Sequence, residues 1–215
     1  MRTMVYHKEI PLPAPDEREI LRYAGVKHAT PEVETLMHEC LALAEGKLRG
    51  SVCWAEYGIV ADGGMLDLGF VKTDSHSLGR NLEGCQSIVL FAATIGLEMD
   101  RLIARQAQLS PACAHMLEAI GTERIESLCD AFCAEFSHAR PRYSPGYGDV
   151  PLEMQREIFA ALNCPKHIGV SLSDRLLMTP RKSVTAIMGI GAEKCSGKSG
   201  CEACKQINCL YRRNV

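Results

Sequence analysis

Residues whose side chains could bind a ligand are concentrated in one loop. It spans residues 140–149 and has the sequence RPRYSPGYGD. Pro141 and Pro145 lack amide protons and fix φ, so this loop cannot be helical. Gly146 and Gly148 allow sharp turns or the close approach of a ligand. Arginine can hold a carboxylate with two parallel hydrogen bonds, and tyrosine offers an aromatic face and a hydroxyl. The combination suits a small ligand with a carboxylate and an aromatic ring, although composition alone slightly favours a solvated surface loop.

The pattern Arg142-x-x-Pro145-Gly146-Tyr147 resembles the Arg-x-x-x-Gly-Tyr motif of the activation domain of cobalamin-dependent methionine synthase, where the motif binds S-adenosylmethionine. Downstream, the run from Met178 to Val184 is similar to a Met-x-Pro-x-x-Ser-Val run of the same family. The specific resemblance covers residues 140–190. It implies a free-standing homologue of that domain.

The resemblance also implies a function and roles for single residues. Arg142 would hold the methionine carboxylate, the backbone at Pro145 and Gly146 would approach the adenosine, and Tyr147 would pack beside it or hydrogen-bond to it. The protein would then serve the reductive methylation of cobalamin on a separate methionine synthase or corrinoid protein, with a flavodoxin or ferredoxin as electron donor. With 215 residues, the chain could not also hold homocysteine, folate and cobalamin modules. Methyl transfer of this kind depends on positioning more than on acid–base catalysis.

A long helix that begins at Ser110-Pro111 is predicted to lead into this loop. Glu123, Glu126 and Asp130 fall away from its apolar stripe, and the last two lie one turn apart on the same face. The ordinary interpretation of these acids is a solvated helix face. The functional alternative is that one of them, with Glu126 favoured, meets the sulfonium or a ribose hydroxyl of the ligand.

Four of the 11 cysteines cluster near the C-terminus, at Cys195, Cys201, Cys204 and Cys209. The surrounding segment has too few apolar residues to fold unaided, so a further interaction is needed to stabilise it. Four thiolates could hold zinc or an iron–sulfur cluster, and we favour iron–sulfur because a redox centre suits the implied biology. A disordered tail with reactive thiols is the alternative. Two other functions therefore stay open: an iron–sulfur protein that reduces a corrinoid protein, and a zinc-stabilised binding module. The other seven cysteines are expected to be small core hydrophobes.

The pattern of elements indicates the fold class. Further helices are predicted from Asp16 and from Thr30-Pro31, each after a capping residue. Strands are predicted at residues 51–61, 65–72, 87–93, 167–172 and 183–190. Regular alternation of strands and helices is missing, so we expect an α+β fold with a curved, mostly antiparallel sheet flanked by helices. Residues 1–190 are expected to form this domain, and residues 191–215 a cysteine-rich tail.

Charge and hydropathy exclude some classes of partner. The formal net charge of −2 gives no general reason to expect nucleic acid. No apolar run reaches membrane-spanning length, and the N-terminus lacks the apolar core of a signal peptide. We therefore expect a cytoplasmic protein without a membrane partner.

Overall fold

A computed structural model describes residues 3–192, and its centre is a four-stranded sheet with the strand order β1-β2-β6-β9. A three-stranded sheet, β3-β4-β5, and a two-stranded sheet, β7-β8, lie beside it. Every strand pairing among the described residues is antiparallel. The strands are β1 (Tyr6–Ile10), β2 (Gly50–Gly58), β3 (Val60–Asp62), β4 (Met65–Asp67), β5 (Lys72–Thr73), β6 (Cys85–Thr94), β7 (Ser171–Leu172), β8 (Met178–Thr179) and β9 (Ser183–Gly191).

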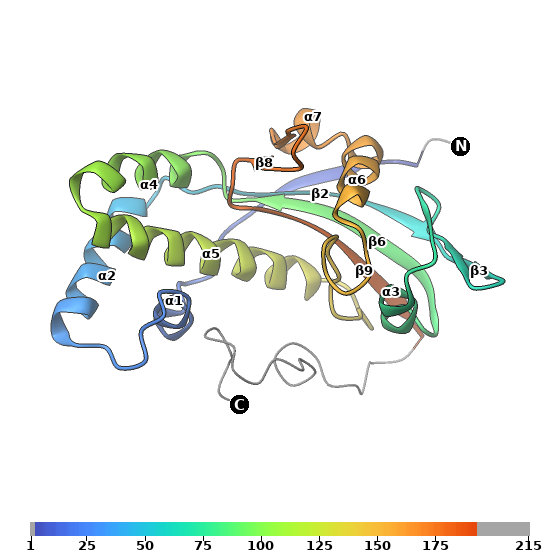
Figure 1. The fold of residues 1–215 in the computed structure, drawn as a ribbon, viewed down its shortest axis with the longest axis horizontal. Helices are drawn as coiled ribbons and strands as arrows, with labels where there is room; N and C mark the ends of the chain where they lie inside the picture. Colours follow the sequence, from blue (N-terminus) through green and yellow to red (C-terminus); the bar gives the residue numbers. More distant parts are fainter. Residues whose placement is uncertain (1–2, 193–215) are drawn as a thin grey trace.

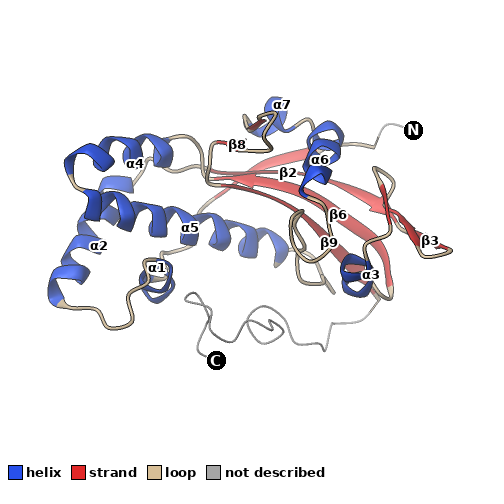
Figure 2. Cartoon of the chain, viewed as in Figure 1, coloured by secondary structure: helices blue, strands red, loops and turns tan. Residues whose placement is uncertain are grey.

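Helices cover both faces of the four-stranded sheet, whose long strands are visibly curved (Figures 1 and 2). One face is covered by α1 (Glu17–Tyr23), α2 (Pro31–Ala44), α4 (Glu98–Leu109) and α5 (Pro111–Cys133). The other face is covered by α3 (His76–Asn81), α6 (Gln155–Leu162), which follows a 3-10 turn at Leu152–Met154, and α7 (Cys164–Ile168). The predicted α+β class with a curved antiparallel sheet is confirmed.

Two hydrophobic cores form because side chains alternate between the faces of a strand. In β6, Val89 and Phe91 belong to the core under α5, whereas Ile88 and Leu90 belong to the core under α6 and α7. All four side chains are at most 1% exposed. The continuous apolar run that predicted a buried strand here therefore reflects burial on both faces.

The helix that leads to the loop is fixed at its start by local chemistry. Ser110 accepts a hydrogen bond from the amide of Cys113 at 3.3 Å, and Pro111 occupies the first helical turn. The helix then crosses β2, β6 and β9 and ends at Cys133, just before the predicted ligand loop (Figure 1). The caps predicted at Asp16 and Thr30 also precede helices, and Asp16 accepts bonds from two amides of α1.

Parts of the sequence prediction were wrong. The strand predicted at residues 167–172 is confined to β7, because residues 164–168 form α7, with Pro165 in its first turn and Gly169 (φ 68°) after its end. The strand predicted at residues 65–72 is broken into β4 and the start of β5, although the turn at residues 62–64 does join β3 to β4. The edge strand β1 was not predicted.

Glu123 is a further correction, because it does not lie on a solvated face. It is 4% exposed and pairs with the neighbouring Arg124, whose Nε donates to Glu123 at 2.5 Å. Arg124 also donates to the carbonyls of Pro13 and Ala14, so the buried pair holds the N-terminal arm against α5.

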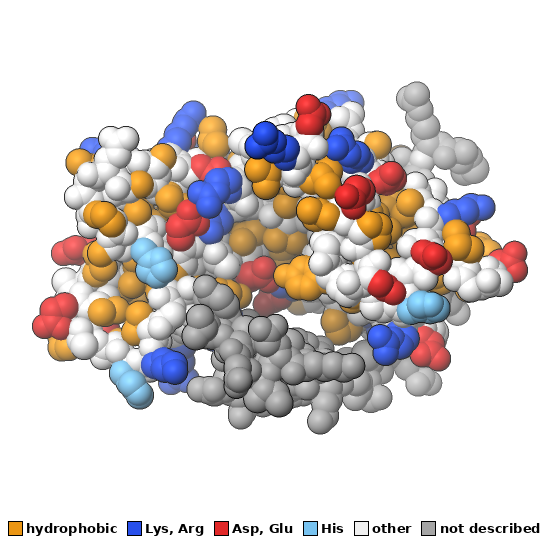
Figure 3. All heavy atoms as spheres, viewed as in Figure 1, with side chains coloured by type: hydrophobic (Ala, Val, Ile, Leu, Met, Phe, Trp, Pro, Cys, Tyr) orange, Lys and Arg blue, Asp and Glu red, His pale blue; other side chains and the backbone are white. Residues whose placement is uncertain are grey.

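Other expectations concern the surface and the tail. Basic and acidic side chains are intermixed on the face shown in Figure 3. No helix within residues 3–192 is long and apolar enough to cross a membrane. The predicted metal ligands Cys195, Cys201, Cys204 and Cys209 lie outside the described residues.

Candidate functional site

The loop after α5 runs along the edge of the central sheet. The amide of Arg140 donates to the Gly189 carbonyl at 2.8 Å. Tyr143 and Ile187 exchange both of their backbone hydrogen bonds, each at 2.8 Å. Residues 139–143 therefore cover the outer edge of β9 in an extended conformation, as the prolines predicted.

The loop then turns sharply at the Pro-Gly-Tyr segment. The Gly146 amide donates to the Val150 carbonyl at 2.9 Å, and the Gly146 φ of 88° is accessible mainly to glycine. Pro145 is buried and anchors the turn, whereas the Tyr147 side chain is 68% exposed. Backbone and aromatic face at the tip are therefore both open to a ligand.

Asp149 closes the loop by fastening it to α3. Its carboxylate accepts from the backbone amides of His76, at 2.8 Å, and Ser77, at 3.2 Å, and from the hydroxyls of Ser75 and Ser77. The hydrogen bonds from Ser75 and Ser77 are the main causes of a pKa well below the usual range. The loop is thus fixed at both ends, to β9 and to α3.

Arg142 lies between the loop and the C-terminal half of α5. Its Nη2 donates to Glu126 Oε2 at 2.5 Å, and its Nη1 donates to Asp130 Oδ1. The structure therefore brings together two of the predicted ligand residues, Arg142 and Glu126, and joins them through an ion pair. The guanidinium thus has two carboxylate partners, both on α5.

Two thiols lie near Arg142, and a tyrosine lies near its partner Glu126. Burial raises the pKa of Cys129 and of Cys133 and so favours their neutral thiol forms, although the charge of Arg142 opposes the rise. On α1, burial and then the charge of Glu126 raise the pKa of Tyr23. The guanidinium of Arg22 lies 4.0 Å from the centre of the Tyr23 ring. Sequence reasoning missed Tyr23 and Cys133, since nothing in the local pattern shows that α1 packs on α5 or that the loop brings Arg142 back to the last turn of α5.

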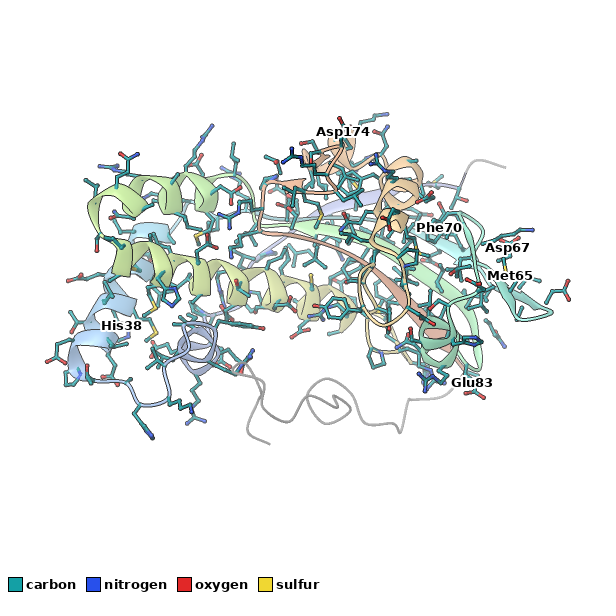
Figure 4. The ribbon with its side chains drawn as sticks, in the orientation of Figure 1. His38, Met65, Asp67, Phe70, Glu83 and Asp174 are labelled. Atoms are coloured by element: carbon teal, nitrogen blue, oxygen red, sulfur yellow. The ribbon has the colours of Figure 1, made fainter. Side chains whose placement is uncertain are left out.

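An open cavity of about 410 Å³ lies between the β3–β4 hairpin and α3, and its lining includes Ser75 and His76, which hold Asp149 of the loop. It is lined in part by Asp62, Met65, His76, Arg80 and Glu83, and Figure 4 shows Met65 on the hairpin and Glu83 beyond the end of α3. These residues are not the predicted ligand residues, which lie on α5 and on the loop. The candidate site is therefore a set of side chains along an open surface and not this cavity.

Comparison with known proteins gives a likeness at the level of the fold. No family model matches the sequence, and no curated protein matches it. Among solved structures, the chain is similar to the MetH reactivation domain bound to AdoHcy, with a TM-score of 0.65 and 18% sequence identity. The match covers 90% of this chain and 80% of that chain. The resemblance that the loop motif indicated is thus confirmed for the fold.

Proposed function

We propose that this protein binds S-adenosylmethionine at the 140–149 loop and assists the reductive methylation of cobalamin on a separate protein. The observation that carries the proposal is the Arg142-x-x-x-Gly146-Tyr147 loop, fixed along the edge of a sheet whose fold matches a domain solved with AdoHcy. AdoHcy is what remains of S-adenosylmethionine after its methyl group is transferred. The two molecules differ by this methyl group, so a site that binds AdoHcy can make the same contacts with the rest of S-adenosylmethionine.

The residues of the loop suit the parts of this ligand. The Arg142 guanidinium can donate two parallel hydrogen bonds to the amino-acid carboxylate. Gly146 lets the adenosine approach the backbone, and the exposed ring of Tyr147 offers it an aromatic face. Bound S-adenosylmethionine supplies an activated methyl group, and the protein's own residues hold and orient it.

The proposed partner is a cobalamin-dependent methionine synthase or another corrinoid protein, with a flavodoxin or ferredoxin as the source of electrons. The loop tip supports a role in trans, because a methyl donor bound beside the exposed Tyr147 is accessible to a second protein. Glu126 would serve the site by orienting Arg142.

Calorimetric titration of S-adenosylmethionine and AdoHcy tests the proposal. We expect the wild type to bind both ligands and Arg142→Ala to lose this binding. Arg156→Ala is the matched control, because this exposed arginine of α6 donates to the Asp174 carbonyl, away from the loop. Tyr147→Ala should weaken binding without changing thermal stability, since its side chain is exposed.

Two results would overturn the proposal. Failure of the wild type to bind either ligand would remove S-adenosylmethionine as the substrate class. Undiminished binding by Arg142→Ala would move the site away from this loop. If binding at the loop is found, the role in trans is tested next. Methyl transfer from S-adenosylmethionine to a reduced corrinoid protein would be followed by the visible spectrum of the corrinoid.

A further inference from the structure

The two acids that hold Arg142 engage one terminal nitrogen each. Glu126 accepts from Nη2 and Asp130 accepts from Nη1, and both acids come from α5. The guanidinium has five N–H groups, and a ligand carboxylate that binds end-on takes one from each of Nη1 and Nη2, the two nitrogens that these acids contact. The ligand carboxylate carries the same charge as the two acids, so its binding at these nitrogens favours the displacement of one of them.

The two acids differ in how easily they can leave. The side chain of Asp130 is 59% exposed, against 37% for Glu126 and 22% for Arg142. Water can solvate the Asp130 carboxylate once it is released, so its loss from the pair costs little. Glu126 is more enclosed and stands farther from the helix end, so it is better placed to keep Arg142 oriented.

The position of Asp130 in the helix points the same way. Asp130 lies in the last turn of α5, which ends at Cys133. A negative charge is unfavourable at a helix C-terminus, where the backbone carbonyls are unpaired. Helix stability therefore does not account for an acid at this position, whereas its contact with Arg142 does.

We infer that Asp130 occupies the place on Arg142 that the ligand's carboxylate takes, and that it thereby sets the affinity for ligands that carry a carboxylate. This inference rests on the proposed function and adds to it. Glu126 stays with Arg142 as a positioning residue, and Asp130 exchanges with the ligand. Asp130 thus competes with the ligand for Arg142. The free energy of ligand binding is reduced by the free energy of one ion pair, because that pair is broken when the ligand binds.

The test compares AdoHcy with 5′-methylthioadenosine, which has the adenosine and the thioether but no carboxylate. We expect Asp130→Asn to bind AdoHcy about two- to fivefold more tightly than the wild type, the range expected for loss of one exposed ion pair. Binding of 5′-methylthioadenosine should be unchanged. Glu126→Gln should weaken AdoHcy binding because Arg142 loses its orientation.

Glu135→Gln is the matched control, since Glu135 pairs with Lys8 beyond the end of the same helix and should leave both affinities unchanged. Thermal unfolding of each variant confirms that the fold is intact. If the wild type binds AdoHcy but Asp130→Asn binds it no more tightly, or binds both ligands more tightly, the inference is wrong and the proposed function stands. If the wild type binds neither ligand, both are wrong.

Discussion

At the scale of single residues, Asp149 shows how one carboxylate fixes the loop. Its pKa is lowered by the hydroxyls of Ser75 and Ser77 and by two backbone amides, so the charged form is stabilised in the folded state. A lowered folded-state pKa gives stability that is present above the unfolded value, about 4, and is lost as the pH falls below it. Asp149→Asn should therefore reduce stability at neutral pH and flatten the acid dependence. Urea unfolding at neutral pH and near pH 3 measures both effects, and equal acid dependence in the two proteins would contradict this role.

Gly148 is the glycine of the loop that has no room for a side chain. Its φ is 57°, and a Cβ would overlap the Tyr143 hydroxyl and the Ser77 side chain. Gly63 has a similar φ of 55° but open space around it. Gly148→Ala and Gly63→Ala should each lower the free energy of unfolding by about 1–2 kcal/mol, because alanine is strained in the left-handed backbone. Gly148→Ala should lower it by about 1–3 kcal/mol more because of the overlap. Urea unfolding of both variants checks this, and equal losses would show that the loop can relax around a methyl group.

At the scale of elements, the buried pair of Glu123 and Arg124 fastens the N-terminal arm to α5. Both side chains are 5% exposed, and Arg124 satisfies two arm carbonyls as well as Glu123. Removing one partner of a buried pair leaves an uncompensated charge, so Arg124→Ala should destabilise the protein by about 3–5 kcal/mol. The exposed Arg101, paired with Glu98, is the matched control, and Arg101→Ala should cost at most about 1 kcal/mol. Similar free energies of unfolding for the two variants would show that the Glu123–Arg124 pair does not fasten the arm to α5.

Elements with strong local signals could be predicted from the sequence. Ser110-Pro111 and Asp16 are capping residues, and the run in β6 is apolar enough to be buried on both faces. Elements that depend on partners could not be predicted. Within residues 3–192 the edge strand β1 pairs with β2 alone, and it has no fully buried residue to mark it in the sequence. In the same way, the sequence showed that Glu126 and Asp130 share a face, but only the folded chain shows that Arg142, 12 residues after Asp130, reaches that face.

At the scale of the whole molecule, each face of the central sheet has its own core, and both cores lie within residues 3–192. A chain that ends at Ala192 therefore keeps every helix and strand described here. We expect it to unfold cooperatively and to bind AdoHcy as the full chain does. Thermal unfolding followed by calorimetry measures this. Loss of cooperative unfolding would show that the tail belongs to the domain.

The same truncation tests the proposed metal site. The described residues contain no group of three or more side chains arranged to hold a metal, and five of their seven free cysteines are buried. The prediction is that a metal bound by the full chain uses Cys195, Cys201, Cys204 and Cys209, the four thiols with metal-like spacing. We expect metal analysis after anaerobic purification to find metal in the full chain and none in the chain that ends at Ala192. Visible absorbance would assign an iron–sulfur cluster, whereas a colourless zinc protein would favour a structural role for the tail. Equal metal content in the two chains would exclude the tail as the site, because the truncated chain lacks all four thiols.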